Sequence, residues 1–112
     1  MKLPHAESAV VEREKITEYL LNPTHPDNGG KAAFFLSFGF RREDWPSLAT
    51  AFRRLAESVE VRSSVDSPHG QKYIIDGSIE TPGGKTPLVR TVWIVDAGQD
   101  TPRLVTAYPQ EE

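Results

Sequence analysis

One histidine and one lysine lie in a bend where a simple loop needs neither. His25 stands between Pro23 and Pro26, which hold the local backbone extended or turned and limit where the imidazole points. Histidine changes its charge near neutral pH, so this ring suits proton transfer to or from a substrate. A second interpretation stays open, in which His25 is an exposed loop residue that helps to close the bend.

Lys31 follows Gly29 and Gly30 in the first turn of a predicted helix. The unpaired backbone N–H groups of a helix start attract anions, and glycine lets a ligand approach the backbone closely. A cation at this position opposes the helix dipole unless a negative group is bound. These three residues are therefore candidates for binding an anionic substrate. The alternative is a solvated lysine whose stem covers apolar surface.

Four polar residues on predicted strands are further candidates. Arg90 and Thr91 interrupt an otherwise apolar run, and Thr106 and Tyr108 lie two apart on the last run, so their side chains share one face of a strand. A buried arginine needs a partner, so Arg90 is either part of a structural ion pair or an anion-binding group at the edge of a site. Both threonines also suit ordinary strand positions.

Other chemistries find little support. The chain has no cysteine, which excludes disulfides, zinc fingers and a thiol nucleophile. His5 and His69 lie in the N-terminal lead and in a predicted hairpin turn, where histidine is common and inert. The acidic residues are dispersed, without the spacing of metal ligands. We expect no metal and no cofactor.

The first half of the chain has helical periodicity. Apolar residues recur at three and four positions in three segments, which predicts helices over residues 12–21, about 29–39 and 44–59. Asn22 and Pro23 end the first segment, Gly39 ends the second, and Asp44 is a good N-cap for the third.

After residue 59 the apolar period changes to two, and Pro/Gly-rich turns separate four runs, at about 59–66, 71–80, 86–96 and 102–108. Short loops favour successive hairpins, hence a meander of antiparallel strands. The third run is apolar on both faces, so we place it inside the sheet. The chain is thus expected to be one α+β domain over residues 1–112, with about three N-terminal helices packed on a four-stranded antiparallel β-meander.

Charge and hydropathy limit the partners. A net charge of −3 over 112 residues argues against a protein that coats nucleic acid regardless of sequence, although it leaves room for a local basic site. No run approaches the 18 or so apolar residues of a membrane helix, and no export signal is visible. We expect a cytoplasmic protein that does not contact a membrane.

Several motifs together resemble a bacterial domain family of unknown function. That family occurs as small stand-alone proteins and as C-terminal modules of larger phage-related or polymorphic-toxin proteins, and the resemblance spans Leu3 to Pro109. The motifs are YLLNP at 19–23, HP at 25–26, GKA at 30–32, FF at 34–35, GF at 39–40, GQKY at 70–73, RTVWI at 90–94 and PRLVTAYP at 102–109.

The family is in turn distantly similar to the barnase, EndoU, colicin and RelE-like ribonuclease superfamily, in which helices precede a four-stranded antiparallel sheet. This resemblance implies RNA cleavage without metal, by attack of the 2′-hydroxyl on the adjacent phosphate. Carried over to this sequence, it implies one set of catalytic residues and one set that binds substrate. The catalytic set is His25, Lys31, Arg90, Thr106 and Tyr108, and the substrate-binding set is Gly29, Gly30, Thr91 and Arg103. A site with one histidine still needs a second proton carrier.

Two functions from different classes follow. The first is a toxin-type endoribonuclease that cleaves RNA without metal. The second is a non-catalytic interaction module, an immunity- or antitoxin-like protein or a phage accessory protein, that binds a protein partner through its sheet. The acidic net charge favours the second, because acidic small proteins suit basic partners. A homodimer is compatible with both.

Overall fold

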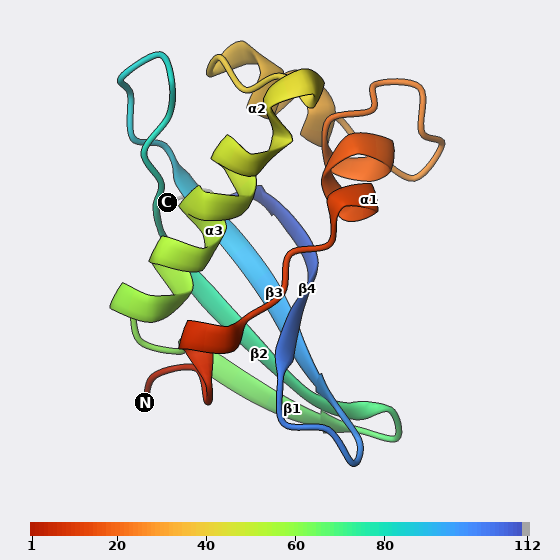
Figure 1. The fold of residues 1–112 in the computed structure, drawn as a ribbon, viewed down its shortest axis with the longest axis vertical. Coiled ribbons are helices and arrows are strands. Elements are labelled where there is room, and N and C mark those ends of the chain that lie inside the picture. Colours follow the sequence, from red (N-terminus) through yellow and green to blue (C-terminus); the bar gives the residue numbers. More distant parts are fainter. Residues whose placement is uncertain (111–112) are drawn as a thin grey trace.

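The computed structural model describes residues 1–110 (Figure 1). Short helices precede a sheet, as the sequence predicts for an α+β fold. The helical elements are η1 (Ala6–Ser8), α1 (Arg13–Lys15), η2 (Ile16–Leu20), α2 (Lys31–Ser37), η3 (Arg42–Asp44) and α3 (Trp45–Ser58). The strands are β1 (Ser63–Ser67), β2 (Gly70–Ser78), β3 (Leu88–Asp96) and β4 (Pro102–Pro109).

The four strands form one antiparallel sheet in the order β1-β2-β3-β4. The predicted meander is confirmed, and β3 lies inside the sheet as its apolar sequence indicates. The helices cover one face of the sheet, with α3 crossing it and α1 beside the β4 edge (Figure 1).

The core lies between α3 and this covered face of the sheet. Leu48 and Phe52 of α3 and Trp93 of β3 are fully buried. Pro46 in the first turn and apolar residues at helical spacing explain why α3 is the element that its sequence predicts best. Gly77 of β2 has no side chain to hold α3 away, since a Cβ atom there would lie 2.6 Å from Leu55 Cδ1. The helix therefore packs closely on the sheet.

The predicted helix over 12–21 is only partly right. Three residues of α1 lead into the π-helical turn η2, in which Leu21 N–H donates to the carbonyl of Ile16, five residues back, at 2.8 Å. The wider turn lets Ile16, Leu20 and Leu21 all be fully buried. Packing against the core has therefore overridden the α-helical period that the sequence suggests.

A second irregularity lies in β4. Val92 pairs with Thr106 while Trp93 pairs with Leu104, so Val105 has no partner on β3 and forms a β-bulge. Because of this extra residue, Leu104 and Ala107 are both buried in the core although they are three apart. Thr106 therefore lies on the opposite, outer face of β4.

Within residues 1–110, no helix is both long and apolar enough to cross a membrane.

Candidate functional site

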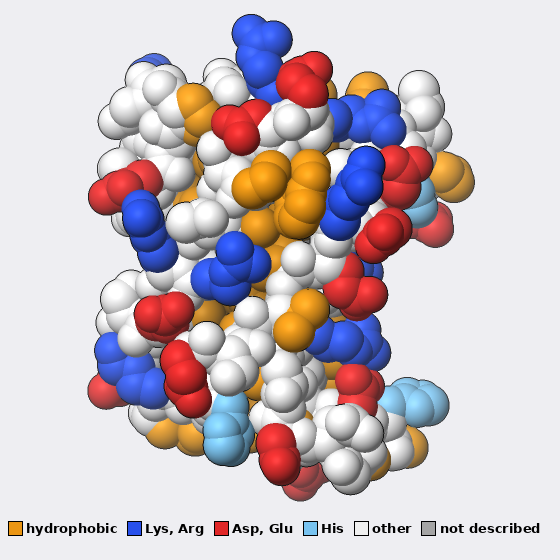
Figure 2. All heavy atoms as spheres, in the orientation of Figure 1, with side chains coloured by type: hydrophobic (Ala, Val, Ile, Leu, Met, Phe, Trp, Pro, Cys, Tyr) orange, Lys and Arg blue, Asp and Glu red, His pale blue; other side chains and the backbone are white. Residues whose placement is uncertain are grey.

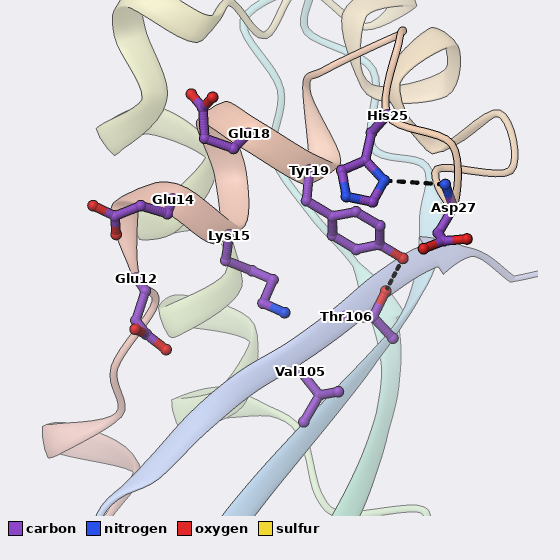
Figure 3. A pocket seen from close by; sticks show the side chains of 9 residues that line it. All are labelled: Glu12, Glu14, Lys15, Glu18, Tyr19, His25, Asp27, Val105 and Thr106. Carbon is purple, nitrogen blue, oxygen red and sulfur yellow. Dashed lines mark hydrogen bonds between the residues drawn. The ribbon is translucent and has the colours of Figure 1, made fainter.

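An open groove of about 720 Å³ lies between the α1–η2 segment, the following loop and β4 (Figure 3). Three lining residues come from the irregular elements just described, namely Tyr19 of η2 and Val105 and Thr106 of the β4 bulge. His25 and Asp27 come from the loop. The remaining lining residues are Glu12, Glu14, Lys15 and Glu18.

Tyr19 lies at the centre of this site. Its hydroxyl accepts a hydrogen bond from Lys31 Nζ at 2.5 Å and lies 3.4 Å from Thr106 Oγ1. The ammonium groups of Lys31 and Lys15 stand 5.0 and 5.4 Å from the centroid of the Tyr19 ring, within the range of cation–π attraction. One phenol thus brings together a helix-side lysine and a strand-side threonine.

The surroundings of Tyr19 favour its ionised form. Burial alone would raise the pKa of the Tyr19 hydroxyl, but the hydrogen bonds from Lys31 and Thr106 and the positive charges of Lys31 and Lys15 lower that pKa below the usual 10.0. A tyrosine poised in this way releases a proton more easily than one in water.

His25 lies against Tyr19. The two ring centroids are 5.0 Å apart at an interplanar angle of 74°, an edge-on contact. His25 Nδ1 accepts the backbone N–H of Asp27 at 3.0 Å. The proton of the neutral ring is therefore on Nε2, the nitrogen that points away from Asp27 in Figure 3. The bend predicted from the prolines thus holds the imidazole in one orientation.

Asn28 joins the bend to both helices. It is 4% exposed, its side-chain amide donates to the Tyr19 carbonyl at 2.5 Å, and its Oδ1 accepts Ala32 N–H at 2.7 Å. Its own carbonyl accepts Lys31 N–H at 3.2 Å. These first amides of α2 were expected to attract an anion, but they are already bonded to Asn28. The charge available to an anion comes from the Lys31 side chain instead.

Gly29 and Gly30 both have positive φ, 64° and 88°, and both are exposed. This conformation, which glycine adopts without strain, turns the chain into α2 beside the groove. Their role in substrate binding stays a prediction.

Arg90 and Tyr108 lie outside the groove. Arg90 binds Asp76 across the strands through two hydrogen bonds, of 2.7 and 2.8 Å, and pairs with Tyr108 of β4 in the register. Hydrogen bonding to Asp76, with a further contribution from Tyr108, raises the pKa of Arg90 above its ordinary value. Thr91, the next residue on β3, is buried in the core, so Arg90 lies on the outer face of the sheet. The structural ion pair that the sequence left open is present.

Two other predicted substrate-binding residues also lie away from the groove. The Thr91 hydroxyl donates to the carbonyl of Ile75 at 3.0 Å and accepts the indole N–H of Trp93 at 2.9 Å, so it satisfies polar atoms of the core. Arg103 binds the carboxylate of Asp96 at 2.8 and 3.1 Å. Of the nine predicted site residues, His25, Lys31 and Thr106 are the three that meet, around Tyr19.

Tyr19 is the residue that sequence reasoning missed. Its spacing from Ile16 and Leu20 is typical of the buried face of a helix, which suggests a core residue. Lys15, His25 and Lys31 lie within 12 positions of Tyr19 in the sequence. That they meet around Tyr19 is seen only in the structure, where the π-helical turn η2 positions the tyrosine ring.

The rim of the groove is acidic. Glu12, Glu14 and Glu18 line its α1 side and Asp27 its loop side, with Lys15 between them (Figure 3). Acidic and basic side chains alternate along this flank of the molecule in Figure 2. Among residues 1–110, no group of three or more histidine and carboxylate side chains has a geometry suited to a metal ion.

Comparison with known proteins identifies the family of the chain. Residues 2–111 match the model of a domain of unknown function, DUF6883, and the chain belongs to that family. No curated protein matches the sequence.

A similar solved structure is a chain of the contact-dependent growth inhibition toxin–immunity protein complex from Klebsiella pneumoniae 342. The two chains are 16% identical with a TM-score of 0.76, and the match covers 96% of this chain and 97% of that one. At this identity the likeness shows a common fold.

Proposed function

We propose that the domain is an endoribonuclease of toxin type, and that the groove around Tyr19 is its active site. The observation that carries the proposal is the position of Tyr19, edge-on to His25 and hydrogen-bonded to Lys31. It supplies the second proton carrier that a one-histidine site lacks. The common fold with a chain of a toxin–immunity complex is consistent with this function.

The contacts suggest a role for each group. Tyr19, whose phenolate Lys31 stabilises, takes the proton of the 2′-hydroxyl, and the 2′-oxygen attacks the adjacent phosphorus. The bond from phosphorus to the 5′-oxygen breaks, and His25 gives its Nε2 proton to that oxygen. For this step Nδ1 must first take up a proton from solvent, which opens its hydrogen bond from Asp27 N–H; after the transfer the ring is neutral again. The products are a 2′,3′-cyclic phosphate and a 5′-hydroxyl.

Charge builds up on the phosphate oxygens during this step. Lys31 stands beside the Tyr19 hydroxyl and Lys15 over its ring, so both neutralise that charge, and the Thr106 hydroxyl donates a hydrogen bond. No metal is needed for this route. Arg90 and Tyr108 stay predicted site residues that would contact RNA outside the groove.

The first prediction concerns cleavage in chelator. Purified protein should convert RNA to fragments with 2′,3′-cyclic phosphate ends in the presence of EDTA. Tyr19→Phe keeps the ring but removes the proton carrier, and His25→Ala removes the other; each should lower kcat/KM by about 10²–10⁴-fold. Tyr73→Phe and His5→Ala are matched controls outside the groove. RNA that stays intact at high protein concentration in every buffer would exclude this activity.

A second candidate function is a non-catalytic module that binds a basic protein. The acidic groove rim and the net charge of −3 favour this alternative. Expression in bacteria separates the two functions. An active nuclease should slow growth, and His25→Ala should restore it. Normal growth with the wild-type protein, together with intact RNA in the cleavage assay, would support the interaction module.

A further inference from the structure

One side of α2 carries two partly buried aromatic rings next to Lys31. Lys31, Phe34 and Phe38 are spaced at i, i+3 and i+7 and so share one side of the helix and its last turn. Lys31 reaches Tyr19, so this flank borders the proposed site. Phe34 and Phe38 are both only partly buried. A short surface helix usually carries polar residues on such a flank.

The rings of Phe34 and Phe38 pack on aromatic residues of the core. Phe34 and Phe38 have centroids 5.0 Å apart, and Phe34 also makes an edge-on contact with Phe35 at 5.1 Å. Phe35 is fully buried and in turn contacts Phe52 of α3 at 5.7 Å. The rings are therefore packed against the core, and this packing reduces the ordering that binding a ligand would require.

We propose that Phe34 and Phe38 form a stacking shelf for the bases of single-stranded RNA. The inference rests on the proposed function and specifies that this side of α2 binds the bases of the RNA substrate. Along the helix axis, Phe34 lies about 4.5 Å and Phe38 about 10.5 Å from Lys31. A phosphate beside Lys31 therefore leaves the neighbouring bases within reach of the rings. Stacking on aromatic side chains is tolerant of base identity, because every base has a π face.

The shelf is tested by RNA binding without cleavage. All proteins carry His25→Ala, and binding of a fluorescent RNA octamer is followed by anisotropy. Phe34→Leu keeps an apolar side chain but removes the ring, and should weaken binding about tenfold; Phe38→Leu should act in the same direction. Leu36→Ala is the control, since Leu36 is 37% exposed and does not share the side of α2 that carries Lys31.

Octamers with one abasic position give the second readout. At one position, loss of the base should weaken binding to the parent protein about tenfold but leave binding to Phe34→Leu unchanged. Equal affinities of Phe34→Leu and the Leu36→Ala control would overturn the shelf while cleavage by the wild-type protein still supports the nuclease. Absence of both binding and cleavage would overturn the nuclease and the shelf together.

Discussion

At the scale of single residues, the candidate site depends on a tyrosine that local pattern assigns to the core. The sequence singles out His25 and Lys31 because histidine and lysine are unusual in a Pro/Gly-rich bend. Tyr19 has no such mark, because an aromatic residue at helical spacing is usually buried. The role proposed for Tyr19 rests on its contacts with Lys31, Thr106 and His25.

The ionisation of Tyr19 provides a prediction at this scale. The fold lowers the Tyr19 pKa, so this phenolate should stabilise the folded state above pH 10, and the contribution should be lost as pH falls through the lowered pKa. Absorbance at 295 nm should show one of the three tyrosines ionising below pH 10.0. Lys31→Met should move that step upward, because the cation that favours the phenolate is gone.

Lys85→Met serves as the control, since Lys85 lies in the exposed β2–β3 loop. A titration in which Lys31→Met matches this control would contradict the contact between Lys31 and Tyr19.

At the scale of elements, regular segments could be predicted from sequence and irregular ones could not. Helix α3 and the strand order follow from amphipathic spacing and short turns, which are local signals. The π-helical turn and the β4 bulge each contain one residue more than the regular element, and such a difference leaves no local pattern. The strand β1 starts at Ser63, later than the sequence predicts, because Val59 N–H still bonds to Leu55 of α3 and Val61 N–H bonds to the Met1 carbonyl.

Two hairpin glycines allow a test of how closely the backbones of neighbouring hairpins approach each other. Gly70 begins β2 with φ +147°, and a Cβ atom there would overlap the carbonyl oxygen of Val95 and lie 2.9 Å from Asp96 Cα. Gly70→Ala should therefore lower the free energy of unfolding by about 3 kcal/mol. Gly98→Ala, at φ +79° with nothing within 4 Å, should cost only about 1 kcal/mol.

Urea denaturation followed by the fluorescence of the two tryptophans, of which Trp93 is fully buried, measures both free energies. Similar losses for the two variants would show that the close contact beside Gly70 is relieved by a shift of the β3–β4 hairpin.

At the scale of the whole molecule, charge separates the two candidate functions. The chain carries −3 overall, and four carboxylates line the groove against the cations of Lys15 and Lys31. For an RNA enzyme, this rim slows association with the substrate. For a module that binds a basic protein, the same rim provides the attraction.

Reversing one charge on the groove rim tests whether RNA is the substrate. If RNA is the substrate, Glu14→Lys should raise kcat/KM for RNA about threefold at low salt, and the gain should shrink as salt screens the charge. Glu57→Lys on α3 makes the same change of net charge away from the groove and should have little effect. A loss of activity in Glu14→Lys would indicate that the carboxylate itself serves the substrate.

The π-helical turn η2 and the β4 bulge meet across the groove, where the Tyr19 hydroxyl lies 3.4 Å from Thr106 Oγ1. Each owes its form to one additional residue, so the site is encoded by chain length as well as by residue identity. A relative that has lost one residue from η2 or from the middle of β4 can retain every motif and the same core. Its tyrosine and threonine would then point in different directions. When members of this family are compared, single-residue gaps at these two places therefore reveal more about shared chemistry than the percentage of identical positions.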